Sequence, residues 1–411
     1  FKEAKDLCYY SNIFTTHTPV PAGIDIFPRW MFEKYFGAYA VEDLKIDFNR
    51  LFEEGNNLYG QSMGDNFNMA YLAINNSNFI NGVSKLHGEI SRKMWALPET
   101  RSQIDSITNG VHTKTYLSGV SEKIYKSNFG NDWINVDNIW KKISELPDET
   151  LWSLRNKNRR KLVNFVRERT IDNVKISHES ETKIAAAQNL LDESALTIGF
   201  ARRFATYKRG TLVLRDLDRL HKILEDSKRK VQFIFSGKAH PKDDGGKNFI
   251  HEILMFANKN GFKKNIMFLD NYDMDVAKRL VSGCDVWLNN PRKPLEASGT
   301  SGMKVIANGG INLSITDGWW LEGYSKETGW EIKSPDNYDK LSDEEVNEFE
   351  SKSLYDTLEN EIIPMFYNRD KRDIPVEWVN MMRGSISKLT PEFNTGRMVK
   401  EYHEKFYSKV R

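Results

Sequence analysis

The sequence predicts an α/β fold built around a doubly wound parallel sheet. Between about residues 195 and 320, short continuous apolar runs alternate with stretches of helical periodicity. Strands that are apolar throughout are typical of parallel sheets, because helices cover both of their faces. The length of 411 residues also allows two domains, each with its own core.

The predicted strands follow one another with a helix between most pairs. We expect strands at 196–201, 231–235, 266–269, 286–288 and 311–315. We expect helices at about 208–224, 247–259 and 273–282, and a further helix that begins near Met303. In such sheets ligands bind beyond the carboxyl ends of the strands, where the strand order reverses. Polar segments that follow a strand are therefore the candidates for a site.

The flanking regions predict further units. Residues 1 to about 110 are expected to form a separate unit with a strand at 13–15, and residues 391–411 an amphipathic helix. The acidic stretch 343–345 is expected to be the first turn of a helix. The stretch 145–190 is predicted to be helical, and we interpret its basic residues as a solvated face, with phosphate binding as the alternative. Those residues are Arg155, Arg159, Arg160, Lys161, Arg167 and Arg169.

Composition excludes several classes of protein. The net charge of +2 argues against a nucleic-acid partner, and no apolar run is long enough for a membrane span. The two cysteines form no Cys-x-x-Cys pair, and the eight histidines include no His-Glu-x-x-His pair, so neither a disulfide framework nor a metal site is indicated. We expect a cytoplasmic protein without a signal peptide.

The segment Glu296-Ala297-Ser298-Gly299-Thr300-Ser301-Gly302-Met303-Lys304 follows a predicted strand. Small residues let backbone N–H groups approach an anion, and a helix start would add a favourable partial charge. A lysine there can pair with the anion or condense with a cofactor aldehyde. The spacing is not that of a Walker A loop, and no Gly-x-Gly-x-x-Gly fingerprint follows a strand. The segment predicts a site for a phosphorylated ligand, with a plain strand–turn–helix connection as the alternative.

A second polar segment places four cations within eight residues after the strand at 196–201. They are Arg202, Arg203, Lys208 and Arg209. Guanidinium and ammonium groups at a strand end can hold a phosphate dianion through charge-assisted hydrogen bonds. The alternative is a solvated turn with a basic helix start, although cations there oppose the helix dipole.

The run 289–304, continued by Asn308-Gly309 and Asp317-Gly318-Trp319-Trp320, closely resembles the cofactor segment of α-glucan phosphorylases of the bacterial and archaeal branch. The resemblance covers about residues 10–410 and implies a two-domain glycosyltransferase fold of the GT-B type. It implies an incomplete N-terminal Rossmann-like domain over 1–111, a C-terminal Rossmann-like domain over 112–385, and a helix over 386–411 that returns to the first domain. The chain opens on Phe1, and the resemblance implies a C-terminal fragment of a longer protein.

The resemblance also implies roles for particular residues around pyridoxal 5'-phosphate. Lys304 matches the lysine that carries this cofactor. Other cofactor contacts are implied for Thr300, Ser301, Arg202 and Tyr272. Arg203 and Lys208 match the ligands of substrate phosphate, so they join Lys304 as the catalytic candidates. Sugar contacts are implied for Glu296, Ser298, Gly299, Tyr207, Asn109 and His17. One departure is Asp273, which stands where animal members carry an arginine on the cofactor phosphate.

The implied reaction is reversible, retaining phosphorolysis of α-1,4-glucan by orthophosphate, giving α-glucose 1-phosphate. The implied partners are the glucan, orthophosphate and glucose 1-phosphate, with a possible homodimer in a full-length protein. Two alternatives stay open at this point. One is a retaining transferase that uses a sugar nucleotide, as glycogen synthases do, and the other is a non-catalytic glucan-binding fragment.

Overall fold

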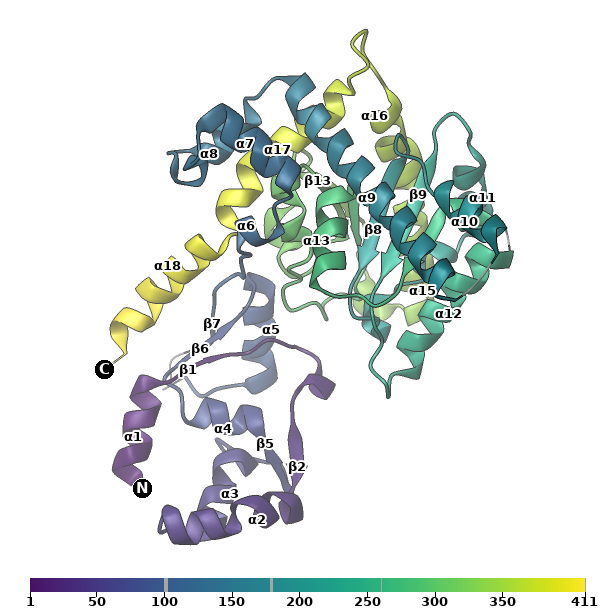
Figure 1. Cartoon of the computed structure of the whole chain (residues 1–411). Helices are drawn as coiled ribbons and strands as arrows, with labels where there is room; N and C mark the ends of the chain where they lie inside the picture. Colours follow the sequence, from purple (N-terminus) through teal and green to yellow (C-terminus); the bar gives the residue numbers. More distant parts are fainter. Residues whose placement is uncertain (100–102, 178–179, 260, 411) are drawn as a thin grey trace.

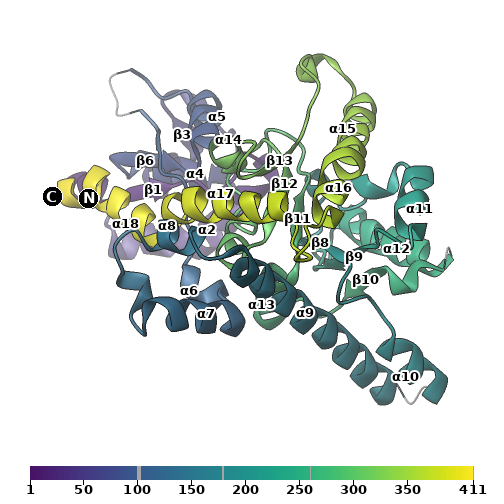
Figure 2. The ribbon, with the colours of Figure 1, turned by 90° about the horizontal axis from the view of Figure 1, so that it is seen from above.

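The computed structural model of the protein describes residues 1–99, 103–177, 180–259 and 261–410. Its largest sheet has six parallel strands in the order β10-β9-β8-β11-β12-β13 (Figures 1 and 2). The strands are β8 (Leu196–Ala201), β9 (Val231–Ser236), β10 (Ile266–Leu269), β11 (Val286–Asn289), β12 (Ile311–Ile315) and β13 (Gly329–Ile332). The chain moves outward from β8 to β10 and then returns to the other side of β8 with β11. The predicted doubly wound α/β class is confirmed, and the strand order reverses between β8 and β11.

Alternating side chains bury both faces of this sheet. In β9, Phe233 and Phe235 belong to one hydrophobic cluster, whereas Ile234 between them belongs to another. The first cluster contains residues of α15 (Asp343–Thr357) and α17 (Val376–Glu392), and the second contains residues of α13 (Met274–Gly283). Because successive side chains of a strand point to opposite faces, helices pack on both sides of the sheet.

A smaller parallel sheet lies in the N-terminal part of the chain. It comprises β1 (Ile13–Thr15), β6 (Phe79–Gly82) and β7 (Asp105–Ser106), with β6 in the centre. Two antiparallel pairs accompany it, β2 (Ile26–Pro28) with β5 (Asn66–Asn68), and β3 (Asn57–Leu58) with β4 (Gln61–Ser62). The helices of this part are α1 (Lys2–Ser11), α2 (Arg29–Ala38), α3 (Phe48–Asn56), α4 (Met69–Asn75) and α5 (Lys85–Trp95).

The last helix, α18 (Thr395–Lys405), contacts this small sheet rather than the large one (Figures 1 and 2). The Tyr402 hydroxyl accepts a hydrogen bond from Nδ2 of Asn81 at 2.9 Å, and the Phe406 ring lies 5.3 Å from that of Phe79. The C-terminal end of the chain is thereby fastened to the strands β1 and β6. The domain limits at 111 and 385 stay predictions.

The remaining helices surround the large sheet. They are α6 (Thr113–Tyr116), α7 (Gly119–Phe129), α8 (Ile139–Ser144), α9 (Asp148–Ile176), α10 (Glu181–Gln188), α11 (Leu217–Glu225), α12 (Asp244–Lys259), α14 (Trp320–Gly323) and α16 (Ile363–Tyr367). The acidic stretch 343–345 does form the first turn of α15, where Ser342 and Glu345 make a capping box. Along the described ranges, no helix combines the length and the apolar character that crossing a membrane requires.

One predicted helix begins later than expected, and another is wrong. Of the helix expected at about 208–224, only the part from Leu217 onward is α-helical, because the 3-10 turns Thr206–Lys208 and Leu212–Leu214 come first and α11 begins only after Asp216 caps it. The helix expected near Met303 is instead two 3-10 turns, Gly302–Lys304 and Ile306–Asn308. Gly309, with φ at 75°, ends the second turn. No long helix dipole therefore points at an anion here, and its donors must be side chains and loop N–H groups.

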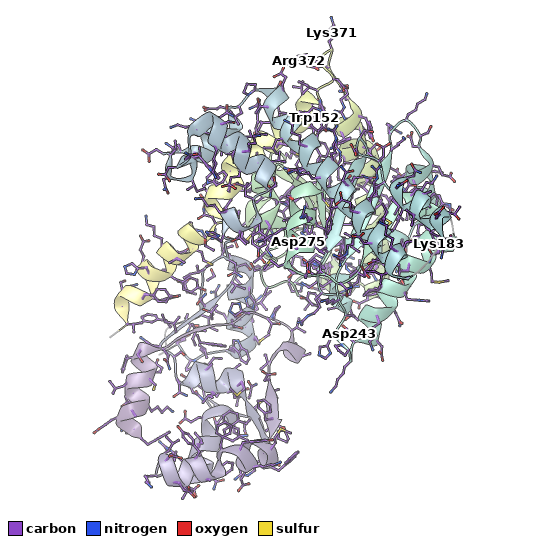
Figure 3. All side chains as sticks on the ribbon, in the orientation of Figure 1. Trp152, Lys183, Asp243, Asp275, Lys371 and Arg372 are labelled. Carbon is purple, nitrogen blue, oxygen red and sulfur yellow. The ribbon has the colours of Figure 1, made fainter. Side chains whose placement is uncertain are left out.

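The interpretation of the basic stretch 145–190 as a solvated face is wrong for two of its arginines. Arg155 and Arg159 in α9 are buried, and both donate to the buried carboxylate of Asp285, at 3.0 and 2.8 Å. Arg159 also lies over the ring of Trp152, labelled in Figure 3, at 5.5 Å. Asp285 precedes β11 and accepts the backbone N–H of Thr197 in β8. The pair thus joins α9 to the two strands at which the strand order reverses.

Candidate active site between two sheet edges

A cavity of about 360 Å³ lies beyond the carboxyl ends of strands from both parallel sheets. From the large sheet it is lined by residues that follow β8, β10 and β11. From the small sheet it is lined by residues that follow β1, β6 and β7, among them His17, Val83 and Asn109. This is the place expected for a ligand, because the large sheet reverses its strand order between β8 and β11.

The structure brings all of the sequence-predicted site residues to this cavity except Lys304. The lining includes His17, Asn109, Arg202, Arg203, Tyr207, Lys208, Tyr272, Glu296, Ser298, Gly299, Thr300 and Ser301. Lys304 lies one 3-10 turn beyond Ser301 and is half-buried. Its Nζ is 4.5 Å from the ring centroid of Tyr116, a side chain that packs on the same hydrophobic cluster as Tyr272. The lysine is therefore next to the cavity wall rather than in it.

The loop 296–301 is held from behind by the turn that follows β12. Gly299 has φ at 72°, a conformation that other residues adopt with strain. Gly318 has φ at 54°, and a Cβ there would lie 2.3 Å from the carbonyl oxygen of Ser298. That carbonyl accepts the N–H of Trp319 at 2.8 Å, and Trp287 Nε1 donates to Ser301 Oγ at 3.1 Å. The loop conformation thus depends on residues far along the chain.

The carboxylate of Glu296 occupies the cationic side of the cavity. Lys208 Nζ donates to both of its oxygens, at 2.9 and 2.8 Å, and Arg202 Nη2 donates to Oε2 at 3.0 Å. All three side chains are largely buried. The two cations that were predicted to meet phosphate groups are therefore paired with an internal anion.

Burial shifts the acid–base properties of this cluster. It lowers the pKa of Lys208 to about 8, and the neighbouring Arg202 adds to the lowering. Burial acts to raise the pKa of Glu296, but the charges of Arg202 and Lys208 outweigh it and hold that pKa below its ordinary value. Burial raises the pKa of Asp317 to about 7, although its carboxylate accepts the N–H groups of Glu296 and Gly318.

The cavity offers polar groups that have no partner among the described residues. They include the buried Nε and Nη1 of Arg202 and the buried Oγ of Ser298. Arg203 is exposed and lines the same cavity. Because buried guanidinium donors are rarely left unpaired, this set fits a ligand with anionic and hydroxyl groups. The hydroxyls of Thr300 and Ser301, together with Arg202 and the nearby Lys304, fit a phosphorylated aldehyde cofactor.

Sequence reasoning missed residues that shape the site from behind. Asp317 supports the backbone of Glu296 at 2.9 Å, and Ser84 Oγ donates to the carbonyl of Ala297 at 2.6 Å. Tyr116 lies under Lys304. No local spacing in the sequence could have found Ser84 or Tyr116, because each lies more than 180 residues from its partner. Asp273, the departure noted above, caps α13 by accepting the N–H of Val276.

Comparison with known proteins places these residues in a family. A family described as carbohydrate phosphorylase matches residues 1–332. A maltodextrin phosphorylase of Thermococcus litoralis is 43% identical over 100% of this chain and 48% of its own length. A glycogen phosphorylase of Aquifex aeolicus is 40% identical over 97% of this chain and 57% of its own length, and the human liver form is 23% identical over 93% and 48%. The chain spans about half the length of these relatives.

The chain is more identical to the archaeal and bacterial relatives than to the human one, in agreement with the branch that the run Asp317-Gly318-Trp319-Trp320 predicts. The family match also covers the loop 296–304 and the cationic segment after β8, the two stretches that build the cavity. This chain belongs to the carbohydrate phosphorylase family.

Proposed function

We propose that this chain carries the cofactor and phosphate sites of an α-1,4-glucan phosphorylase, which releases terminal glucose as α-glucose 1-phosphate. The observation that carries the proposal is one cavity that gathers three cations from the end of β8 and the loop 296–301 from the end of β11. The names of its relatives, maltodextrin and glycogen phosphorylase, support the substrate class. The location proposed with this function is the cytoplasm, in keeping with two cysteines that form no disulfide.

In the proposed reaction, orthophosphate forms a bond to C1 of the terminal glucose while the bond from C1 to the glycosidic oxygen breaks, with retention. The proton on phosphate passes to the leaving oxygen. Arg203 and Lys208 would hold the phosphate, because their charges stabilise an anion beside the positive charge that develops on the sugar. Lys208 must first exchange the carboxylate of Glu296 for phosphate. The freed carboxylate can then accept a hydrogen bond from a sugar hydroxyl.

Pyridoxal 5'-phosphate is proposed as the cofactor, held by Lys304, by the hydroxyls of Thr300 and Ser301, and by Arg202, with Tyr272 beside its ring. When bound, the cofactor supplies a phosphate group that can exchange a proton with substrate phosphate. Two nitrogens of Arg202, Nε and Nη1, have no partner among the described residues, and they support this assignment because they leave a buried cation ready for a second anion. Lys304, against Tyr116, is close enough to Ser301 in the chain to serve the same ligand.

The sugar is proposed to lie against Asn109, Tyr207, Ser298, Gly299 and His17. Burial lowers the pKa of His17, so this imidazole is neutral at pH 7 and can both donate and accept hydrogen bonds. These contacts would orient the glucose whose C1 faces the phosphate.

The test is borohydride reduction of the protein after incubation with pyridoxal 5'-phosphate, followed by peptide mass spectrometry. We expect a pyridoxyl-phosphate adduct on Lys304. Lys304→Ala should abolish the adduct, whereas Lys293→Ala, a change at the other lysine of the 290–304 stretch, should leave it in place. An adduct on other lysines alone, or none at all in the chain extended to the length of its relatives, would refute the cofactor proposal. Binding of a sugar nucleotide in its place would support the transferase alternative, and glucan binding without turnover the non-catalytic one.

A further inference from the structure

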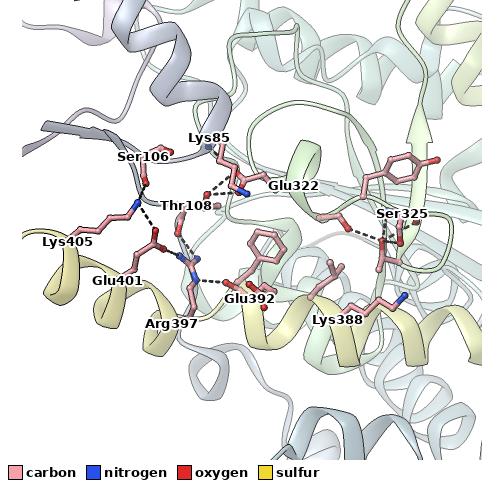
Figure 4. Close-up of a pocket in the computed structure, with 15 residues that line it drawn as sticks. Lys85, Ser106, Thr108, Glu322, Ser325, Lys388, Glu392, Arg397, Glu401 and Lys405 are labelled. Atoms are coloured by element: carbon pink, nitrogen blue, oxygen red, sulfur yellow. Dashed lines mark hydrogen bonds and ion pairs between the residues drawn. The ribbon is translucent and has the colours of Figure 1, made fainter. Parts of the chain in front are cut away.

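A second cavity, of about 540 Å³, is drawn in Figure 4 and is lined by neighbours in the chain of residues that line the candidate site. Two short stretches of chain separate the cavities. Val83 and Asn109 line the candidate site, whereas Lys85 and Thr108 line the second cavity. The backbone of Asn109 donates to the carbonyl of Val83 at 3.1 Å, so the two stretches are joined in one wall. Any displacement of Thr108 therefore moves Asn109 on the other side.

Glu322, which belongs to the unit that carries the large sheet, forms hydrogen bonds with both stretches of this wall. Its carboxylate accepts the Thr108 hydroxyl at 2.8 and 2.9 Å and the backbone N–H of Lys85 at 2.9 Å. Lys85 is the first residue of α5, so the carboxylate also lies where a helix N-terminus favours negative charge. Only 12% of the Glu322 side chain is exposed. One carboxylate thus holds both stretches of the wall.

Arg397, in α18, lines the same second cavity as Glu322 and also contacts this wall. Its Nη2 donates to the carbonyl of Thr108 at 2.6 Å and to that of Asn109 at 3.2 Å. Its Nε donates to the carbonyl of Glu392 and its Nη1 to the carboxylate of Glu401. The guanidinium is therefore anchored by one bond to the end of α17 and one within α18 (Figure 4), and it donates its other two bonds to Thr108 and Asn109.

The chain next to Asn109 has no room to shift towards α18. A Cβ at Gly110 would lie 2.2 Å from the carbonyl oxygen of Asn394. Val111 exchanges backbone hydrogen bonds with Phe393 and Thr395, at 3.0 and 3.1 Å. By contrast, the side-chain amide of Asn109 makes no hydrogen bond with another described residue, so it remains available to a ligand.

We propose that Glu322 and Arg397 are positioning residues that set where Asn109 faces the candidate site, although neither lines it. The residues of the second cavity would then fix the wall that carries Asn109, the residue proposed to contact the sugar. The inference rests on the proposed function, in which Asn109 faces the sugar while the phosphate lies on the cations that follow β8. It predicts that loss of the hydrogen bonds made by either Glu322 or Arg397 weakens the binding of the sugar and leaves the binding of phosphate unchanged.

The first measurement needs no ligand. Hydrogen exchange of a peptide over 104–112 is compared in the wild-type chain, Arg397→Met, Glu322→Ala and Lys388→Met. Lys388 lines the same cavity but pairs with Glu327 and contacts neither Thr108 nor Asn109, so it is the matched control. We expect faster exchange of this peptide by about tenfold in the first two variants only. Unchanged exchange in those variants would overturn the proposal.

The second measurement is calorimetric titration with glucose 1-phosphate and with orthophosphate. In Arg397→Met and Glu322→Ala we expect about tenfold weaker binding of glucose 1-phosphate and unchanged binding of orthophosphate, since one or two hydrogen bonds are lost on the sugar side alone. Arg397→Lys should recover part of the loss, because a lysine can still donate to one carbonyl. Equal weakening of both ligands would show a merely structural role and would overturn the proposal.

The two measurements also separate this inference from the proposed function. A wild-type chain that binds neither ligand contradicts the proposed function, and the exchange experiment then decides alone whether Glu322 and Arg397 hold the wall. In that case, faster exchange confined to 104–112 supports the proposal that Glu322 and Arg397 hold this wall in place, and unchanged exchange overturns that proposal.

Discussion

The substitution Glu296→Gln tests whether an internal carboxylate stands in for phosphate in the candidate site. Glu296 is bonded to Lys208 and Arg202 at 2.8–3.0 Å, and the exposed fractions of the three side chains are 11, 13 and 7%. Removing one partner of a buried ion pair costs about 3–5 kcal/mol, because a buried charge is left uncompensated. We therefore expect the variant to lose about 3 kcal/mol of its free energy of unfolding when no anion is present.

Phosphate should restore part of that loss. In the wild-type chain phosphate must take the cations from Glu296, whereas in the variant they are free. If half of the lost free energy returns on binding, about 1.5 kcal/mol, the variant binds phosphate roughly tenfold more tightly. Phosphate at 100 times its dissociation constant adds about 2.7 kcal/mol to the stability of any chain that binds it only when folded.

The assay is urea unfolding followed by tryptophan fluorescence, over a series of phosphate concentrations at constant ionic strength. Glu350→Gln is the matched control, because Glu350 is fully buried and pairs with Arg209 outside the cavity. The control should lose stability without any gain in its response to phosphate. If phosphate stabilises Glu296→Gln no more than it stabilises the wild-type chain, the idea of an internal counter-ion is wrong.

Three further predictions concern charge. Because the pKa of Lys208 is lowered to about 8, its positive charge is lost as the pH rises through 8, so sulfate affinity should fall between pH 7 and 9. Titration calorimetry checks this, and Lys208→Met should bind weakly at every pH. Arg155→Met should lower the free energy of unfolding by about 1–3 kcal/mol, since it removes buried hydrogen bonds to Asp285 and to the Asn308 carbonyl, while Arg159 still pairs with Asp285. Urea denaturation measures that loss, and a change below about 1 kcal/mol would contradict the buried pair. For Asp317 the folded chain binds the extra proton, since its pKa rises from 3.8 to about 7, so its contribution to stability falls as the pH rises from about 4 to 7. Asp317→Asn should flatten the dependence of stability on pH in this window, and an unchanged slope would show that another group titrates there.

Short stretches of sequence were enough to predict the strands of the large sheet and the segments that form the candidate site. The five strands predicted between 196 and 315 are present, because continuous apolar runs bounded by polar turns have one stable place, inside a covered sheet. The segments that follow β8 and β11 could be recognised as site-forming, since cations, small residues and a lysine stand in short spacings there. Helix propensity alone could not show that the chain is not α-helical at the start of the 208–224 stretch and near Met303. Tertiary hydrogen bonds decide the backbone conformation there. Asn290 Nδ2, for example, donates to the carbonyl of Arg209, whose φ of 48° ends the first turn.

By itself, the sequence determined the α/β class, the family resemblance and the segments that meet at the candidate site. Only the tertiary structure decided what those segments touch. It paired Lys208 and Arg202 with Glu296, buried Arg155 and Arg159 on Asp285, and put Lys304 beside Tyr116 rather than in the cavity lining. The physical reason is that charge pairing and burial depend on contacts between residues hundreds of positions apart, as between Thr108 and Arg397, and no spacing along the chain records such contacts.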